Sequence, residues 1–359
     1  MIFFRLILFC CSFFWAANTF AQNLAYYHDK RNQFWVFDNG EYHKLDHIPA
    51  RDVLLGGDYL IYVNGRNEMI FYKNGQTQMI EFNVNNSYMP TNYFLFNQQT
   101  GGGIQIIHDE KRHKVALGFD IEYALGDSIF AYKDFDRYLK AYYHEEVAEI
   151  TNEPLINFKV SDNSVAYATQ SEMLYLFYDG KIEAIADRIP NDYYVGNNFL
   201  VYLNPFNDLV AYDAGETHEL SSFYPPKSYR VGNNIAAFVT DEGYFKVYWQ
   251  GETQELLPFP PKQYQIVDNT LMYVDDRGYL HVFYKGKDKT LEAYEPQYIK
   301  MFDGIVVYMD LDGRLKGFYE GKKVEISDRI VESFEVMGRV VLYQVLNGET
   351  MVFFDGRNY

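Results

Sequence analysis

The chain has 359 residues, of which 48% are hydrophobic and 18% aromatic, and its formal net charge is −17. Such an acidic surface repels phosphate backbones and anionic lipid headgroups, so the composition argues against nucleic acid and against a membrane surface as partners. Both cysteines, Cys10 and Cys11, lie in an N-terminal segment that we expect to be removed. We therefore expect a mature chain without disulfides, cysteine nucleophiles or thiolate metal sites.

The N-terminal segment has the pattern of a secretory signal peptide. One basic residue, Arg5, precedes an apolar run over Ile7–Ala17, and the segment ends on Ala21 with small residues at the positions that signal peptidase reads. The run is too short for a membrane-spanning helix. Lipidation of Cys10 is a weaker alternative, because Phe9 precedes it in place of a small residue. We predict a signal peptide over 1–21 and one domain over 22–359, with no direct membrane insertion.

After the signal, one aromatic pattern recurs ten times at a spacing of about 35 residues. In each copy an aromatic or apolar residue stands three places before a tight turn: Phe37, Tyr72, Ile107, Tyr142, Phe177, Tyr212, Tyr248, Phe283, Phe318 and Phe353. A second aromatic series precedes the first: Tyr62, Phe96, Tyr132, Tyr167, Tyr202, Phe238, Tyr273, Tyr308 and Tyr343. A constant period requires each copy to occupy an equivalent place in one closed or stacked architecture.

Residues 229–262 show the strands of one copy. Short runs with strand character are separated by turn residues, and no 3.6-residue apolar period indicates a helix. The four predicted strands are Tyr229–Val231, Ile235–Val239, Tyr244–Trp249 and Glu252–Leu256. The second is wholly apolar and the fourth is polar, which fits a propeller blade whose inner strands are buried between neighbours and whose outer strand faces water.

The sequence therefore predicts an all-β fold, a β-propeller of about ten (nine to ten) four-stranded blades. The first copy starts at Leu24 in its apolar strand, so we expect it to lack the leading strand. The last copy ends at Tyr359, just after the Gly356 turn, so we expect it to lack the fourth strand. Two smaller propellers and a parallel β-helix are the alternatives.

Acidic residues gather in the turns between second and third strands. They are Asp134, Asp136, Asp208, Asp241, Glu242, Asp275, Asp276, Asp310 and Asp312. A ring of carboxylates suits a cation or a basic partner. The favoured interpretation is turn chemistry, because Asp and Asn tolerate the backbone that such hairpins need. We expect these turns and the loops between copies to lie on opposite faces of the ring.

The loops between copies combine proline with aromatic residues. Stiff loops of this kind lose little entropy on docking, and aromatic residues are enriched at the centres of interfaces. We predict partner-binding roles for Phe223, Tyr224, Pro225, Pro226, Phe259, Pro260, Pro261, Tyr294 and Pro296. The alternative is that each proline only starts the strand that follows.

The sequence shows no site of recognisable chemistry. His108, His113 and His144 could meet on neighbouring blades, but a zinc site needs a converging ligand set, which the ring geometry disfavours. No nucleophile elbow, metalloprotease motif, phosphate loop or dinucleotide fingerprint appears. We therefore predict no catalytic, cofactor-binding or metal-binding residues, no cofactor, and a non-enzymatic binding module. Paired carboxylates for glycoside hydrolysis at the central channel stay open as an alternative.

In period and strand pattern the mature chain resembles bacterial β-propellers, although it has no recurrent Trp-Asp pair, kelch double glycine or Asp-box. Its signal peptide, with Gln22 after the cleavage site, and its Tyr-, Phe- and Asn-rich composition are similar to those of Bacteroidota envelope proteins. In size and character it is similar to the periplasmic plug subunit of the type 9 secretion translocon.

The resemblance implies a periplasmic protein that binds a protein partner in an envelope or outer-membrane complex, as an accessory or plug subunit of a secretion channel. Because the sequence ends within its last repeat, we expect retention in the periplasm rather than release. A carbohydrate-binding or carbohydrate-active propeller, with hydrolase-like or lyase-like chemistry, is the alternative function.

Overall fold

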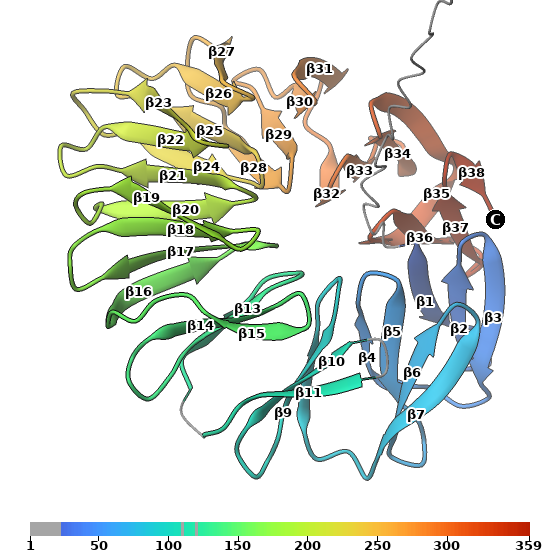
Figure 1. The fold of residues 1–359 in the computed structure, drawn as a ribbon. Helices are drawn as coiled ribbons and strands as arrows, with labels where there is room; N and C mark the ends of the chain where they lie inside the picture. Colours follow the sequence, from blue (N-terminus) through green and yellow to red (C-terminus); the bar gives the residue numbers. More distant parts are fainter. Residues whose placement is uncertain (1–22, 109–110, 119–120) are drawn as a thin grey trace, which may run out of the picture.

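The computed structural model describes residues 23–108, 111–118 and 121–359, and every regular element in these ranges is a β-strand. The strands form antiparallel sheets that follow one another in chain order around a ring (Figure 1). The predicted signal peptide and its cysteines lie outside the described residues. Within them, no helix has the length and apolar character needed to cross a membrane.

The ring consists of ten blades, as the repeat predicts. Blade 1 contains β1 (Leu24–His28), β2 (Phe34–Asp38) and β3 (Glu41–Asp46). Blades 2 to 4 contain β4 (Arg51–Leu55), β5 (Tyr59–Val63), β6 (Glu68–Lys73), β7 (Gln76–Phe82), β8 (Ser87–Pro90), β9 (Leu95–Gln98), β10 (Ile104–His108), β11 (Lys111–Ala116), β12 (Tyr123–Leu125), β13 (Phe130–Lys133), β14 (Leu139–Tyr143) and β15 (Glu146–Glu149). Blades 5 to 7 contain β16 (Leu155–Val160), β17 (Ser164–Thr169), β18 (Leu174–Tyr178), β19 (Lys181–Ala186), β20 (Asp192–Gly196), β21 (Phe199–Leu203), β22 (Leu209–Asp213), β23 (Glu216–Ser221), β24 (Ser228–Val231), β25 (Ile235–Val239), β26 (Phe245–Trp249) and β27 (Glu252–Leu257). Blades 8 to 10 contain β28 (Gln263–Val267), β29 (Thr270–Val274), β30 (Leu280–Tyr284), β31 (Lys287–Glu292), β32 (Gln297–Phe302), β33 (Ile305–Met309), β34 (Arg314–Tyr319), β35 (Lys322–Met337), β36 (Val340–Val345), β37 (Thr350–Phe354) and β38 (Arg357–Asn358).

One long strand joins the last two blades. The first part of β35 pairs with β34 of blade 9, and its last part pairs with β36 of blade 10, so one seven-stranded sheet forms both blades. Within the described residues blade 1 has three strands, and the place where its leading strand would stand, before Leu24, falls outside them. The expectation for the last copy is wrong. After the turn at Gly356 the chain reverses, and β38 pairs with β37 as a two-residue fourth strand.

Blade 7 shows why the residues of one copy form these strands. All five residues of β25 are buried, whereas the first four residues of β27 are exposed. Between β26 and β27, Gln250 and Gly251 have φ values of 48° and 84°, and a tight hairpin turn with the twist of its strands needs positive φ at both positions. The register between these strands shifts at Phe245/Lys246, and such bulges increase the twist of a blade.

The hydrophobic core is divided among the interfaces between blades. Each aromatic or apolar residue of the first repeated series faces the preceding blade: Tyr248 of blade 7, for example, packs with Phe199 and Val201 of blade 6. The second aromatic series is buried throughout, from Tyr62 to Tyr343. Each blade therefore buries its apolar surface only against its neighbours, and the constant period follows from that requirement.

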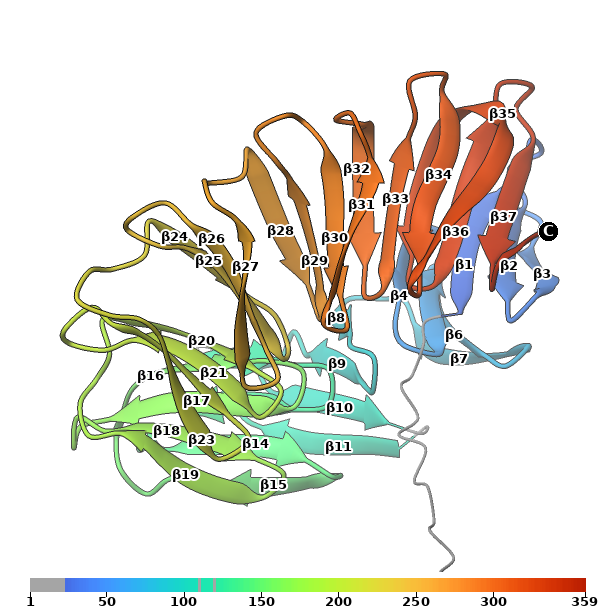
Figure 2. The same ribbon diagram turned by 90° about the horizontal axis from the view of Figure 1, so that it is seen from above.

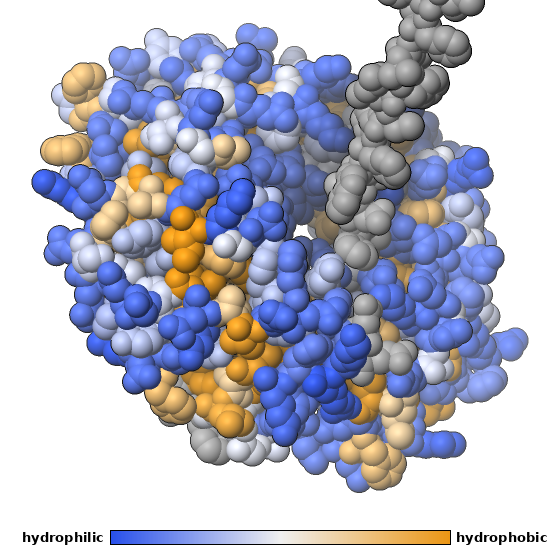
Figure 3. Space-filling model, in the orientation of Figure 1, coloured by the Kyte–Doolittle hydropathy of each residue, from blue (hydrophilic) through white to orange (hydrophobic). Residues whose placement is uncertain are grey.

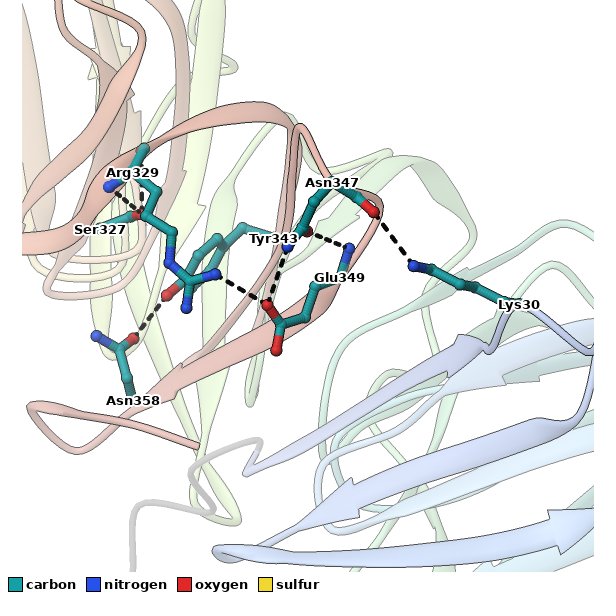
Figure 4. Close-up of polar contacts among 7 residues, drawn as sticks. All are labelled: Lys30, Ser327, Arg329, Tyr343, Asn347, Glu349 and Asn358. Carbon is teal, nitrogen blue, oxygen red and sulfur yellow. Dashed lines mark hydrogen bonds and ion pairs between the residues drawn. The ribbon is translucent and has the colours of Figure 1, made fainter.

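The ring closes where blade 1 meets blade 10. Ala25 and Phe37 of blade 1 share a buried cluster with Val340 and Val352 of blade 10. The ring of Phe37 also contacts the ring of Tyr359, with 5.2 Å between centroids. At the rim of this junction Lys30 Nζ donates to the Asn347 carbonyl at 3.2 Å, and the same turn is braced by an ion pair between Arg329 and Glu349 (Figure 4).

The ring is buckled. Seen from above, the strands of β16–β19 run across the view and those of β32–β37 run up it (Figure 2). The blades nevertheless follow one another without a break from β4 to β38, and blade 1 packs against blade 10. A single closed ring therefore replaces the alternative of two smaller propellers.

Candidate functional site

The connections of the blades lie on two faces of the ring. We call one of them the connector face; it carries the turns that join the second and third strands of each blade. We call the other the hairpin face; it carries the turns that join first to second strands and third to fourth strands. The loops between blades belong to the connector face: Phe223 N in one of them donates to Asp208 Oδ1 of a second-third turn at 2.9 Å. A Cβ added at Gly278, in the second-third turn of blade 8, would lie 3.3 Å from Lys262 Nζ in the loop that leads into the same blade.

The expectation that acidic turns and proline–aromatic loops occupy opposite faces is therefore wrong. Two antiparallel strands separate a second-third turn from the loop that follows, and the one hairpin between them returns the chain to the face from which it started. Acidic and aromatic side chains consequently share the connector face.

The acidic turns are held by their own carboxylates. Asp310 Oδ1 accepts the N–H groups of Asp312 (2.9 Å) and Arg314 (2.8 Å), and Asp310 Oδ2 lies 2.8 Å from Lys316 Nζ. Burial works to raise the pKa of Asp310, but these donors together hold it below its ordinary value. Asp134 shows the same pattern. Turn chemistry thus accounts for Asp134 and Asp310. The described ranges contain no group of three His, Cys, Asp or Glu arranged for a metal ion.

Strongly exposed apolar side chains are confined to the connector face. Among the described residues, the large apolar side chains that are at least 60% exposed are Phe82, Leu117, Phe135, Phe206, Phe223, Tyr224, Tyr298, Leu311 and Leu346. All of them lie in second-third turns, in loops between blades or at the strand ends beside those loops. Phe135 and Phe223 are the most exposed, at 89% and 86%. Apolar residues also gather in a band over the blades near β15–β19 (Figure 3).

The structure divides the predicted partner-binding residues into three groups. The exposed ones are Phe223, Tyr224, Pro225 and Pro260. The half-buried ones are Pro226, Phe259, Pro261 and Tyr294, and the buried one is Pro296. Phe259 packs against the core between blades 7 and 8, so it supports the fold as well as lining the surface.

The sequence analysis missed the apolar tips of the second-third turns, such as Phe135, Phe206 and Leu311. A signal was present, because Asp134 and Asp310 each precede one of these residues. A residue inside a turn closed by an Asp side chain points away from both strands and cannot be buried. An apolar residue at that place is therefore exposed wherever the turn forms.

A second group of polar residues, which we call the polar centre, lies on the hairpin face. It comprises the turn residues Asn92, Asp127, Asp162, Asn197, Asn233, Asp268 and Asp303. The side-chain amide of Asn233 donates to Asp162 Oδ2 at 2.6 Å and to Asp268 Oδ1 at 3.0 Å. Since Asp162 belongs to blade 5 and Asn233 to blade 7, the inner turns of blades that are not neighbours meet here.

Two carboxyl groups of the polar centre, those of Asp127 and Asp268, resist ionisation. Burial, followed by the negative charge of Asp162, raises the pKa of Asp127 to about 6. Burial also raises the pKa of Asp268 to about 7, and the charges of Asp162, Asp303 and Asp127 add to the effect. Asp303 Oδ1 in blade 9 accepts hydrogen bonds from the preceding blade, from Asn269 N at 3.1 Å and from the Thr270 hydroxyl at 3.2 Å. These hydrogen bonds tie the blades together at the axis.

The three histidines singled out in the sequence do not converge. His108 stacks on Tyr93 with 4.8 Å between centroids, and its Nδ1 lies 3.6 Å from Glu145 Oε1. His144 stacks on Tyr143, and His113 packs beside the ring of Tyr142. Each ring takes part in a separate aromatic contact.

Three solved structures that match this chain share little sequence with it. A computationally designed protein, Ika8, is 13% identical, with 75% of this chain and 96% of that chain covered and a TM-score of 0.36. BamB from Moraxella catarrhalis is 12% identical, with 74% and 95% covered and a TM-score of 0.33. PorZ, a surface component of the type IX secretion system of Porphyromonas gingivalis, is 9% identical, with 92% and 56% covered and a TM-score of 0.30.

No curated protein matches the chain. The model of one family, described as a 10-bladed beta propeller domain, matches residues 18–359, which span all ten blades. The chain belongs to the family of 10-bladed β-propeller domains.

Proposed function

We propose that this protein is a non-enzymatic propeller that binds a protein partner through its connector face. One observation carries the proposal: the strongly exposed apolar side chains of the described chain all lie on that face. Exposed apolar groups gathered on one side of a protein are typical of a surface that is covered by another macromolecule.

The apolar tips are presented on rigid supports. Phe206 lies in a turn where Asn204 Oδ1 accepts the N–H groups of Phe206 and Asp208, both at 2.9 Å. Phe223 is held beside the same turn by its own N–H bond to Asp208. An aromatic side chain on a preformed turn loses little conformational freedom on docking, so more of its burial appears as affinity.

We further propose that the partner belongs to an envelope complex in the periplasm, with this protein as an accessory or plug subunit of an outer-membrane secretion channel. The support is the predicted signal peptide and the similarity in composition and size noted above. The acidic turns of the connector face add a preference for a partner surface with basic residues.

Affinity purification from gently solubilised envelopes tests both proposals. The wild-type protein should recover a stoichiometric outer-membrane channel. The triple variant Phe135→Ser, Phe206→Ser and Phe223→Ser should recover at least about tenfold less, because each residue is an exposed anchor of the kind whose truncation costs more than 1 kcal/mol.

A matched control removes apolar side chains near the other face. Val147→Ser and Ile182→Ser change residues that are 44% and 49% exposed beside third-fourth turns. The control should recover the partner as the wild type does. Equal recovery by the triple variant would exclude the connector face as the docking surface. Failure to recover any protein, together with measurable binding to a polysaccharide, would contradict the proposed function as a whole.

A further inference from the structure

A pocket of about 620 Å³ opens between blades 2 and 3. Its lining includes Asn74, in the turn that joins β6 and β7, and Tyr93, in the turn that joins β8 and β9. Both turns belong to the hairpin face, so the pocket is separate from the connector face. Its volume is within the range of small-molecule sites.

The repeat explains why this interface is open. At the rim of each interface, the last residue of the third strand of one blade stands next to the residue of the first repeated series in the following blade. At four of the interfaces the two form an edge-to-face pair, such as Tyr143 with Phe177, whose centroids are 5.7 Å apart. Elsewhere a tyrosine hydroxyl bridges to a carboxylate, as Tyr72 does to Asp38 Oδ2 at 2.9 Å.

Blades 2 and 3 are the exception among the ten pairs of positions in the sequence. The two residues here are Lys73 and Ile107, so neither carries an aromatic ring. Both line the pocket. Without an aromatic pair or a hydroxyl bridge to close the rim, the floor of the interface is accessible from the hairpin face.

The lining combines an aromatic platform with amides. Tyr93 is 40% exposed, and its ring lies nearly parallel to the ring of His108, with 20° between their planes. Asn74, Gln76 and Gln78 contribute exposed side-chain amides from the opposite wall. Each amide both donates and accepts hydrogen bonds, as a hydroxyl group does, and an aromatic face suits the apolar face of a sugar ring.

The charges of the lining are matched within the protein. Lys73 Nζ lies 3.0 Å from Asp58 Oδ2, and His108 Nδ1 lies 3.6 Å from Glu145 Oε1. A carboxylate therefore stands beside the Lys73 ammonium group and beside the His108 ring, and each competes with an anionic ligand for these side chains. A neutral ligand does not have to displace these carboxylates.

We propose that this pocket binds a neutral sugar ring, held by stacking on Tyr93 and by hydrogen bonds to Asn74, Gln76 and Gln78. The assignment is independent of the proposed protein partner, because the two sites lie on different faces. It requires no reaction, since the pocket is a binding site only.

Saturation-transfer difference NMR on the full-length mature protein tests the proposal. The probes are methyl hexopyranosides, N-acetylglucosamine and N-acetylgalactosamine, with glucuronic acid as the anionic probe. At least one neutral sugar should receive saturation from the wild-type protein. Tyr93→Ala should weaken its binding at least tenfold. The double variant Lys73→Tyr and Ile107→Phe copies the pair of blades 4 and 5, keeps the fold and should abolish binding.

The control variant is Tyr298→Ala, which removes a 70% exposed ring on the other face and should leave sugar binding unchanged. The proposal is overturned if no neutral sugar binds, if glucuronic acid binds more tightly than every neutral probe, or if binding survives both pocket variants. A thermal melt of each variant confirms that it is folded before binding is measured.

Discussion

Replacing Asp268 by Asn should stabilise the protein at pH 8. Asp268 lies in the polar centre, where its Oδ1 accepts the side-chain amide of Asn233 at 3.0 Å. Burial and the charges of Asp162, Asp303 and Asp127 raise its pKa from 3.8 to about 7. The ionised form is therefore the one that the fold disfavours. An asparagine has the same shape, keeps an oxygen that can accept the Asn233 bond and never ionises.

The sign and size of this stabilisation follow from the pKa shift of Asp268. Because the folded-state pKa of Asp268 lies above the unfolded value, its stabilising contribution is complete below about pH 4 and is lost as pH rises through about 7. A shift of about 3 units at 1.36 kcal/mol per unit sets a ceiling of about 4 kcal/mol. Partial solvent exposure screens the charges, so we expect about 2 kcal/mol. With an unfolding entropy of about 2.1 cal/mol/K per residue, a chain of this length should gain about 3 °C in Tm.

Thermal unfolding measured from pH 5 to pH 8 tests this reasoning. The Tm of the wild type should fall toward pH 8, and the Asp268→Asn variant should show a smaller fall and a higher Tm at pH 8. Asp312→Asn removes the same formal charge from an exposed turn. Its Tm should depend on pH as steeply as that of the wild type. If the curves of Tm against pH were parallel for the wild type and Asp268→Asn, the assignment of a raised pKa to this carboxyl group would be refuted.

Two further predictions concern contacts between blades. Tyr248→Phe removes a hydroxyl that donates to Asp213 Oδ2 at 3.0 Å and should lower the free energy of unfolding in urea by about 2 kcal/mol; an unchanged midpoint would contradict a role for this bond. Gly126→Ala places a Cβ 1.9 Å from the Ser161 carbonyl of the next blade and should cost about 3 kcal/mol. Gly101→Ala, whose Cβ meets nothing within 4 Å, should cost much less in the same assay, and equal losses would show that packing between blades is not the cause.

The repeat alone was sufficient to predict the architecture. Strand alternation and the tight turn recur in every copy, with glycine at the turn in eight copies and Glu110 and Glu145 in the other two. This is why Ile235–Val239 could be identified as a buried strand and about ten blades could be counted before the structure was known. The exception was the two-residue strand β38, because so short a pairing leaves no hydrophobic pattern in the sequence.

The functional surfaces were less predictable. Phe223 and Tyr224 were identified correctly as exposed, but the sequence does not show that Phe259 packs into a core or that acidic turns and loops share a face. The Asx residues at 92, 127, 162, 197, 233, 268 and 303 form a visible series with the period of the repeat. Their spacing shows only that they are equivalent, and equivalent places on a ring can be near the axis or far from it.

The sequence by itself determined the blade, because the burial of each strand depends on residues within one copy and its immediate neighbours. Only the tertiary structure decided where the copies meet. The arrangement of blades 5 to 7 brings Asp162 to Asn233 past the blade between them, and the missing aromatic pair at Lys73 and Ile107 becomes a pocket only once two blades face each other. These features depend on the relative placement of several blades, which no single repeat encodes.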